Sequence, residues 1–354
     1  MISKIFIGRA LLLAFSVWLL TAASLCDAAA QSVEQFYKGR SMTILVASRP
    51  GGINDLIARL TSRHLGKHIP GNPTIVVQNL HSSGLALANR IYSGAERDGS
   101  VIAVIERGVP QFAILGDANA RFDPLKLTWL GSVSSYADDA YTLTVNSTFH
   151  AKTVDDLRQS GRPPARIGTT GAGATNAIFT EFAKNVMGLN VQHVRGYRGA
   201  SAVFLAMQRG EADGQVIGLT SIKAQQSTLW KSGAFRPLIA FARTKRFPEL
   251  PDVPTGRELI KDPKSLQLLD FAEAPFFMAL PLIAPPDLPP DRAKALLAGF
   301  MATMKDPEFV ADARKLNLDL SPIDGEAVRK VIEQMRSTPK DVLAAFGKLT
   351  GTKK

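Results

Sequence analysis

The sequence has very little cysteine: Cys26 is the only one in 354 residues. It lies in the first thirty residues, which have the pattern of an export signal. This signal has a basic start, an apolar run over 10–25 and small residues at 28–30. Cleavage near Ala30 removes Cys26, so the mature chain is left without a disulfide or a cysteine nucleophile. We therefore expect an exported protein that is stabilised by its apolar core alone.

Two alternatives to cleavage stay open. A membrane anchor needs roughly 20 apolar residues, but the run over 10–25 is shorter than that and Asp27 closes it. A lipid on Cys26 would also tether the chain, although Leu25 places a large residue where lipid-attachment sites usually have a small one. We expect cleavage, which leaves the mature protein free of the membrane.

Long runs of one charge are also absent. The chain has 42 Lys and Arg against 31 Asp and Glu, a net charge of +11, and its basic residues are scattered. A scattered excess is typical of a solvated surface that attracts anions. We therefore expect no nucleic-acid partner.

Motifs for catalysis are missing as well. There is no GxSxG motif. His64 and His68 have the spacing of a metal pair, but Leu65 stands where a zinc protease needs a glutamate. We interpret both as surface histidines. The sequence predicts neither an enzyme nor a bound metal or cofactor.

Short β-branched runs alternate with amphipathic stretches from residue 41 onward, which is typical of α/β architecture. The chain length fits two lobes. Strands are expected at 43–47, 74–78, 101–105, 141–145, 166–170, 215–218, 237–242 and 277–284. Helices are expected at 55–65, at 200–208 and from residue 290 onward.

A glycine-rich turn joins the first strand to the helix that begins near Asp55. Glycines let the backbone approach a ligand closely, and the first amides of a helix lack intrahelical partners, so such a turn can bind an anion. The alternative is a tight turn in which Asn54 or Asp55 caps the helix. The candidate ligand contacts are Gly51, Gly52, Ile53, Asn54 and Asp55.

A second turn of this kind follows the strand at 166–170. It lacks the third glycine of a dinucleotide fingerprint and the lysine of a P-loop. Its candidate contacts are Thr169, Thr170, Gly171, Gly173, Ala174 and Thr175. Together the two turns predict two lobes that hold one small anion between facing helix N-termini.

A third segment precedes the helix at 200–208. Tyr197 could form one wall of a pocket, and Arg195 or Arg198 could pair with a carboxylate. We expect both arginines on the solvated surface, because that is where arginine usually lies.

Several motifs of this chain match those of one known family. Their shared order and spacing make a chance match improbable. They are 36–40, 50–52 with Asp55 and 58–59, 76–79 with Gly84, 98–99, 170–173, 193–194 with Gly196, Tyr197 and Gly199, Gly210 with Asp213, and 250–255. In these motifs the chain resembles the periplasmic solute receptors of the tripartite tricarboxylate transporter systems, the Bug family.

This resemblance implies a type II periplasmic binding protein, with two α/β lobes that close over a small carboxylate. The first lobe would take 31–139 and 245–354, and the second 140–244, with hinges near 137–141 and 242–246. Both glycine turns would contact the ligand, with Tyr197 and Asp213 nearby. The implied partners are the membrane permease subunits to which the receptor delivers its ligand.

Two other functions stay open. A protein of the same fold could act as a ligand sensor that feeds a signalling protein. An exported α/β enzyme is the third possibility, but it would need a nucleophile or metal site that the sequence does not offer.

Overall fold

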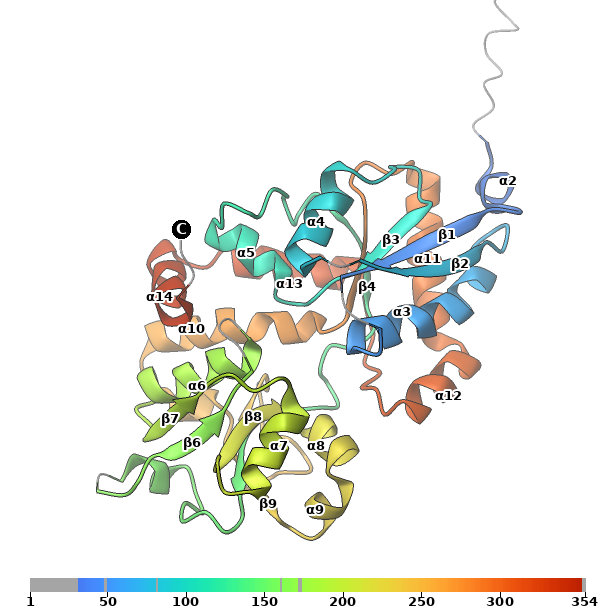
Figure 1. Ribbon diagram of the computed structural model, residues 1–354. Coiled ribbons are helices and arrows are strands. Elements are labelled where there is room, and N and C mark those ends of the chain that lie inside the picture. Colours follow the sequence, from blue (N-terminus) through green and yellow to red (C-terminus); the bar gives the residue numbers. More distant parts are fainter. Residues whose placement is uncertain (1–30, 48–49, 81, 160, 171–173, 352–354) are drawn as a thin grey trace, which may run out of the picture.

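The computed structural model describes residues 31–47, 50–80, 82–159, 161–170 and 174–351. Two β-sheets divide these residues between two α/β lobes, one above the other in Figure 1. The first sheet has six strands in the order β11-β4-β10-β3-β1-β2, and the second has five in the order β7-β6-β8-β5-β9. The predicted α/β class with two lobes is confirmed.

The first lobe is built on a mixed sheet whose inner strands are buried on both faces. Its strands are β1 (Ser41–Val46), β2 (Thr74–Asn79), β3 (Val101–Val104), β4 (Thr128–Ser132), β10 (Pro281–Ala284) and β11 (Ile323–Asp324). Its helices are α2 (Val33–Tyr37), α3 (Ile53–His64), η1 (Leu65–His68), α4 (Gly84–Ser93), α5 (Val109–Leu115), α11 (Pro290–Lys305), α12 (Pro307–Lys315) and α13 (Gly325–Arg336).

Helices cover both faces of this sheet. Because successive residues of a strand point to opposite sides, alternate residues of β1 and β3 pack against different helices. Leu45 and Ala103 belong to the apolar cluster that includes α4, α5 and α13. Ile44 and Ile102 belong to the cluster that includes α3, α11 and α12. β1 pairs in parallel with both β2 and β3, so the turns that follow these strands lie at one edge of the sheet.

The second lobe repeats this arrangement on a smaller sheet. Its elements are β5 (Tyr141–Asn146), η2 (Asp155–Arg158), β6 (Ala165–Gly168), α6 (Thr175–Asn185), β7 (Val191–Val194), α7 (Ala200–Gln208), β8 (Gly214–Gly218), α8 (Leu219–Gln225), α9 (Ser227–Lys231) and β9 (Phe235–Phe241). β6 lies between β7 and β8 and is parallel to both. Val216 packs in the cluster that includes α6, and Ile217 packs in the cluster that includes α7 and α8.

Helices of the C-terminal region lie between the two sheets. These are α10 (Pro263–Glu273), η4 (Ala274–Met278) and α14 (Lys340–Thr350), which follow the short η3 (Arg257–Leu259); α10 and α14 are at the left in Figure 1. The ring of Phe276 in η4 lies 5.7 Å from Phe179 of α6 and 4.9 Å from Tyr141 of β5. One apolar cluster therefore extends through both lobes.

The chain crosses between the lobes after β4 and again after β9. Arg243 ties the two crossing segments together, because its Nη1 donates to the carbonyls of Tyr136 at 3.1 Å, Ala137 at 2.6 Å and Asp139 at 3.3 Å. The predicted hinges and the predicted limits of the lobes fall in these segments. Both stay predictions.

Most of the expected strands are present, but the one at 277–284 is wrong in its first half. Residues 274–278 form the helical turn η4, and β10 begins only at Pro281. Pro275 suits the first turn of a helix, and a short apolar run does not distinguish a buried helix from a strand. The short strands β4 and β11 were missed. No helix in the described part of the chain is long and apolar enough to cross a bilayer.

Candidate functional site

The helices that follow the parallel strands mostly begin without a capping side chain. The N-caps of α3 and α6 are Gly52 and Ala174, and neither makes a side-chain capping bond. The helices α5, α7 and α8 are alike in this respect, whereas Ser83 caps α4. By contrast, aspartates cap α10, α12 and α13. The first amides of α3 and α6 are therefore available to an anionic ligand.

The first glycine turn is closed by Asp55. Gly51 has φ +84°, a conformation that favours glycine, and its amide donates to Asp55 Oδ2 at 2.8 Å. Asp55 also accepts from Arg59 at 3.0 Å and from Asn79 at 2.8 Å. Burial alone would raise the pKa of Asp55, but these hydrogen bonds lower it below its ordinary value. Asp55 thus holds the turn, and a ligand would have to compete for the Gly51 amide.

The second glycine turn is braced by polar side chains on its described residues. Thr169 is fully buried, and its hydroxyl bonds His193 Nε2. His193 Nδ1 lies 2.7 Å from Glu181 Oε1, which also accepts from Arg195 at 2.8 Å. Burial would raise the pKa of Glu181, but its bonds to His193 and Arg195 lower it. These contacts fix the side chain of Thr169, which therefore holds the start of the turn in place.

The remaining polar side chains of this turn act on the start of α6. The hydroxyl of Thr170 donates to Asn176 Oδ1 at 3.2 Å, and Thr175 is the first residue of the helix. The predicted contacts Gly171 and Gly173 lie outside the described residues, as does the predicted export signal at 1–30.

In the third segment, Tyr197 lies near the second turn. A β-carbon on Gly168 would come within 3.2 Å of the Tyr197 ring, so the ring lies against the carboxyl end of β6. Arg195 and Arg198 are exposed, as predicted. Asp213 binds Arg166, with Oδ1 2.7 Å from Arg166 Nη2 and Oδ2 2.8 Å from the Arg166 amide. Asp213 therefore already has charged and backbone partners within the sheet.

Arg107 is a residue that the sequence reasoning missed. It follows β3 and lies over the ring of Phe276, with its Cζ 3.9 Å from the ring centroid. Tyr136 and Tyr141 are close by, at 5.8 and 6.0 Å from the same carbon. The sequence did offer a signal for Arg107. It follows the predicted strand at 101–105, and a position after a strand also made the segment after β1 a candidate site.

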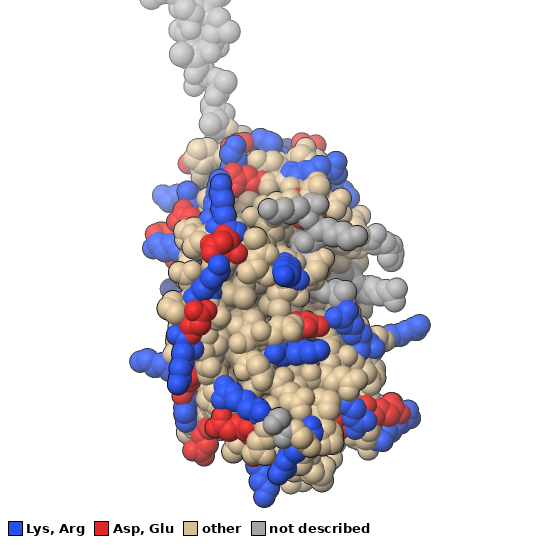
Figure 2. Space-filling view, turned by 90° about the vertical axis from the view of Figure 1, so that its left-hand side faces the viewer, with Lys and Arg blue, Asp and Glu red and all other residues tan. Residues whose placement is uncertain are grey.

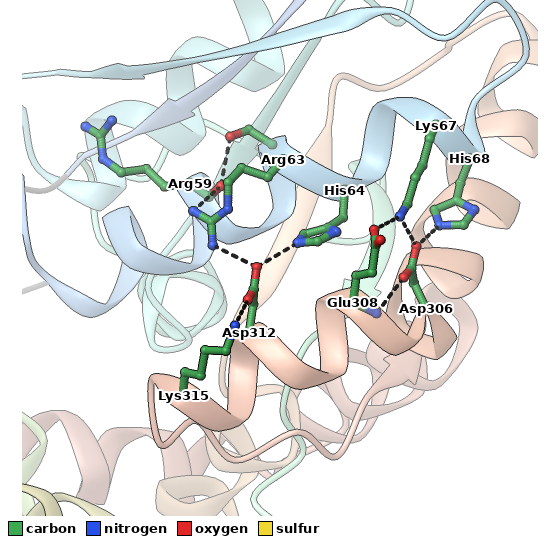
Figure 3. Close-up of polar contacts among 10 residues, drawn as sticks. Arg59, Arg63, His64, Lys67, His68, Asp306, Glu308, Asp312 and Lys315 are labelled. Atoms are coloured by element: carbon green, nitrogen blue, oxygen red, sulfur yellow. Dashed lines mark hydrogen bonds and ion pairs between the residues drawn. The ribbon is translucent and has the colours of Figure 1, made fainter.

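The histidines at the end of α3 and of η1 belong to a charged network rather than a metal pair (Figure 3). His64 Nε2 lies 3.2 Å from Asp312, and His68 Nε2 lies 2.7 Å from Asp306. His64 is buried, so its interpretation as a surface residue was wrong. The two rings bind different carboxylates because Asp306, the N-cap of α12, lies opposite His68, and Asp312 within α12 lies opposite His64.

The side chains of His64, Asp306 and Glu308 lie close enough together to hold a cation. The ammonium group of Lys67 already lies 2.7 Å from Asp306 and 2.6 Å from Glu308 (Figure 3). This group therefore neutralises the carboxylates that a metal would need.

Charges of both signs are interspersed over the face of the molecule shown in Figure 2. Basic and acidic side chains alternate there with uncharged surface, and no continuous basic patch covers this face. This agrees with the scattered charge of the sequence.

The family model for the tripartite tricarboxylate transporter family receptor matches residues 57–347. The chain belongs to this family. The receptor is 25% identical to a UPF0065 protein of Bordetella pertussis over 248 residues, which cover 67% of the receptor and 71% of that relative. The prediction of a solute receptor rather than an enzyme is confirmed.

Solved structures of other solute-binding proteins have the same fold as this receptor. A TctC solute-binding protein from Polaromonas is 17% identical with a TM-score of 0.65, covering 87% of the receptor and 99% of that chain. R. palustris Rpa4515, solved with adipate, is 20% identical with a TM-score of 0.60, covering 88% and 98%. These likenesses confirm the predicted periplasmic binding fold.

Proposed function

We propose that this receptor works in the periplasm, where it captures a small organic carboxylate between its lobes and delivers it to a tripartite tricarboxylate-type permease. Family membership supports a transport role. The adipate in the structure of Rpa4515 supports a carboxylate as the ligand.

One observation carries the proposal: α3 and α6 start in different lobes, each directly after a parallel strand, and neither has a capping side chain. The amides of Ile53 and Asn54 in one lobe and of Thr175 in the other are the donors. Gly51, Gly52 and Ala174 let the backbone approach the ligand, and Tyr197 closes one side. Asp55 and Thr169 hold the turns, and Thr170 positions Asn176.

Proline substitution can remove single donors without breaking the helices, because proline fits the first helical position and lacks only the amide hydrogen. Ile53 and Thr175 occupy that position, and the residues before them have the extended ψ values that proline requires, 163° at Gly52 and 146° at Ala174. Lys340 is a matched control, since it occupies the same position in α14 after Pro339, whose ψ is 143°.

The experiment is a thermal-shift screen of the purified protein against mono-, di- and tricarboxylates. A ligand at 100 times its Kd adds about 2.7 kcal/mol to the free energy of unfolding. We expect I53P and T175P each to weaken binding by about 1.5 to 3 kcal/mol, the usual contribution of a hydrogen bond to a charged group. K340P should bind as the wild type does. Wild-type affinity in both site variants would disprove the proposed donors.

A further inference from the structure

A small cavity lies where the two lobes meet, beside the first turn of α6. Its volume is about 90 Å³, and α5, α6, η4 and α14 contribute to its walls. Its walls are mainly apolar, with side chains from Phe112, Leu115, Ile178, Phe179, Phe276 and Phe346. Thr175 also lines it, so the cavity adjoins the proposed carboxylate site.

Arg107 is the one arginine among the described residues that line this cavity. Its guanidinium group stacks on Phe276 at 3.9 Å. Within the described residues no carboxylate forms an ion pair with it, and its aromatic neighbours Tyr136 and Tyr141 are neutral phenols. The positive charge at the wall of the cavity is therefore not compensated by an acidic side chain.

The preceding residue does not neutralise Arg107 either. The carboxylate of Glu106 lies against the first turn of α4, where a β-carbon on Gly84 would come within 1.6 Å of Glu106 Oε2. Glu106 thus points to α4, while Arg107 points to the aromatic rings of the junction between the lobes.

We propose that this receptor binds a short apolar monocarboxylate, with its carboxylate between Arg107 and the Thr175 amide proposed above, and its hydrocarbon chain in the cavity that both residues line. The inference rests on the proposed function and specifies the ligand class. A space of 90 Å³ is roughly the volume of three water molecules in the liquid, a size that suits a short hydrocarbon chain. Pentanoate has such a chain.

The apolar walls select against a second carboxylate. Glutarate has the same five-carbon chain as pentanoate, but its second carboxylate would enter a space walled mainly by phenylalanine, leucine and isoleucine. An ionised group buried without a partner is strongly disfavoured. We therefore expect pentanoate to bind at least about tenfold more tightly than glutarate.

Calorimetric titration of the purified protein with pentanoate and with glutarate tests this. R107Q removes the charge and should weaken pentanoate binding about tenfold or more, the loss of one hydrogen bond to a charged group. R107K keeps the charge and should retain part of the affinity. I178F fills the cavity and should weaken pentanoate more than glutarate. R209Q is the matched control, since Arg209 is an exposed arginine at the end of α7.

Circular dichroism confirms that each variant is folded before it is titrated. Glutarate binding as tightly as pentanoate would overturn the inference and leave the proposed carboxylate receptor intact. Wild-type pentanoate affinity in both R107Q and I178F would also overturn it. If neither acid binds and the wider carboxylate screen is negative too, the proposed function itself fails.

Discussion

The carboxylate of Asp55 accepts the backbone amide of Gly51 at 2.8 Å, so the first glycine turn is closed by a residue of the helix that it precedes. The same carboxylate accepts from Arg59 and Asn79, and its side chain is almost fully buried. Asp55 therefore determines the shape of the turn that presents the amides of Ile53 and Asn54. The geometry of the turn therefore depends on one buried carboxylate.

We expect D55N to lower the free energy of unfolding by about 2 kcal/mol, because an amide cannot replace a charged acceptor for three donors. The folded-state pKa of Asp55 lies below its ordinary value, so its stabilisation is present above that ordinary value and is lost as the pH falls through the folded one. Urea unfolding at pH 7 and pH 3 measures this. D155N is the control, because Asp155 is an exposed partner of Arg158. Equal stability of D55N and D155N would contradict the assigned role.

The sequence was sufficient to find the turns, because glycines between a strand and a helix are a local pattern. It could not show that Asp55 would consume the Gly51 amide, since that bond depends on the φ of +84° that Gly51 adopts. Arg107 was missed for a related reason. Its position over Phe276 could not be foreseen, because Phe276 is distant in the sequence and the helical turn that holds it was not expected.

Glu273 should make the stability of the receptor depend on pH. It is 1% exposed, its Oε1 accepts from the amide of Ala242 at 2.8 Å, and its Oε2 has no partner in the described part of the chain. Burial raises its pKa from 4.5 to about 8, so the folded state binds more protons than the unfolded state between these values. Stability should therefore fall as the pH rises from 4.5 to about 8.

We expect E273Q to be more stable than the wild type at pH 9 and similar to it near pH 5, because glutamine keeps the acceptor oxygen without a charge. Thermal unfolding across this range measures the difference. E326Q is the matched control, since Glu326 is exposed and pairs with Lys330. A wild-type pH profile in E273Q would show that Glu273 does not change its protonation state there.

The network on α12 should show the opposite pH dependence. Hydrogen bonds from Lys67 and, to a smaller extent, from His68 hold the pKa of Asp306 well below its usual range. The stability that Asp306 contributes therefore falls as the pH drops below its ordinary pKa, and it is fully lost only in strong acid. We expect D306N to have a lower Tm than the wild type at pH 7 and the difference to shrink below roughly pH 4, where an ordinary aspartate is protonated. E308Q changes an exposed partner of the same lysine and should have a smaller effect at pH 7. A larger effect in E308Q would be inconsistent with this role.

Arg243 should control how firmly the lobes are held, because one of its nitrogens binds three carbonyls of the other crossing segment. We expect R243M to lower the free energy of unfolding by about 2 kcal/mol and to broaden the distribution of distances between the lobes. The mature chain without Cys26 would have no cysteine, so spin labels on cysteines introduced at Lys231 of α9 and Arg314 of α12 report that distance cleanly. R209M is the control for loss of an exposed arginine. An unchanged distribution in R243M would mean that the shared apolar cluster alone, through Phe179 and Phe276, fixes the lobes.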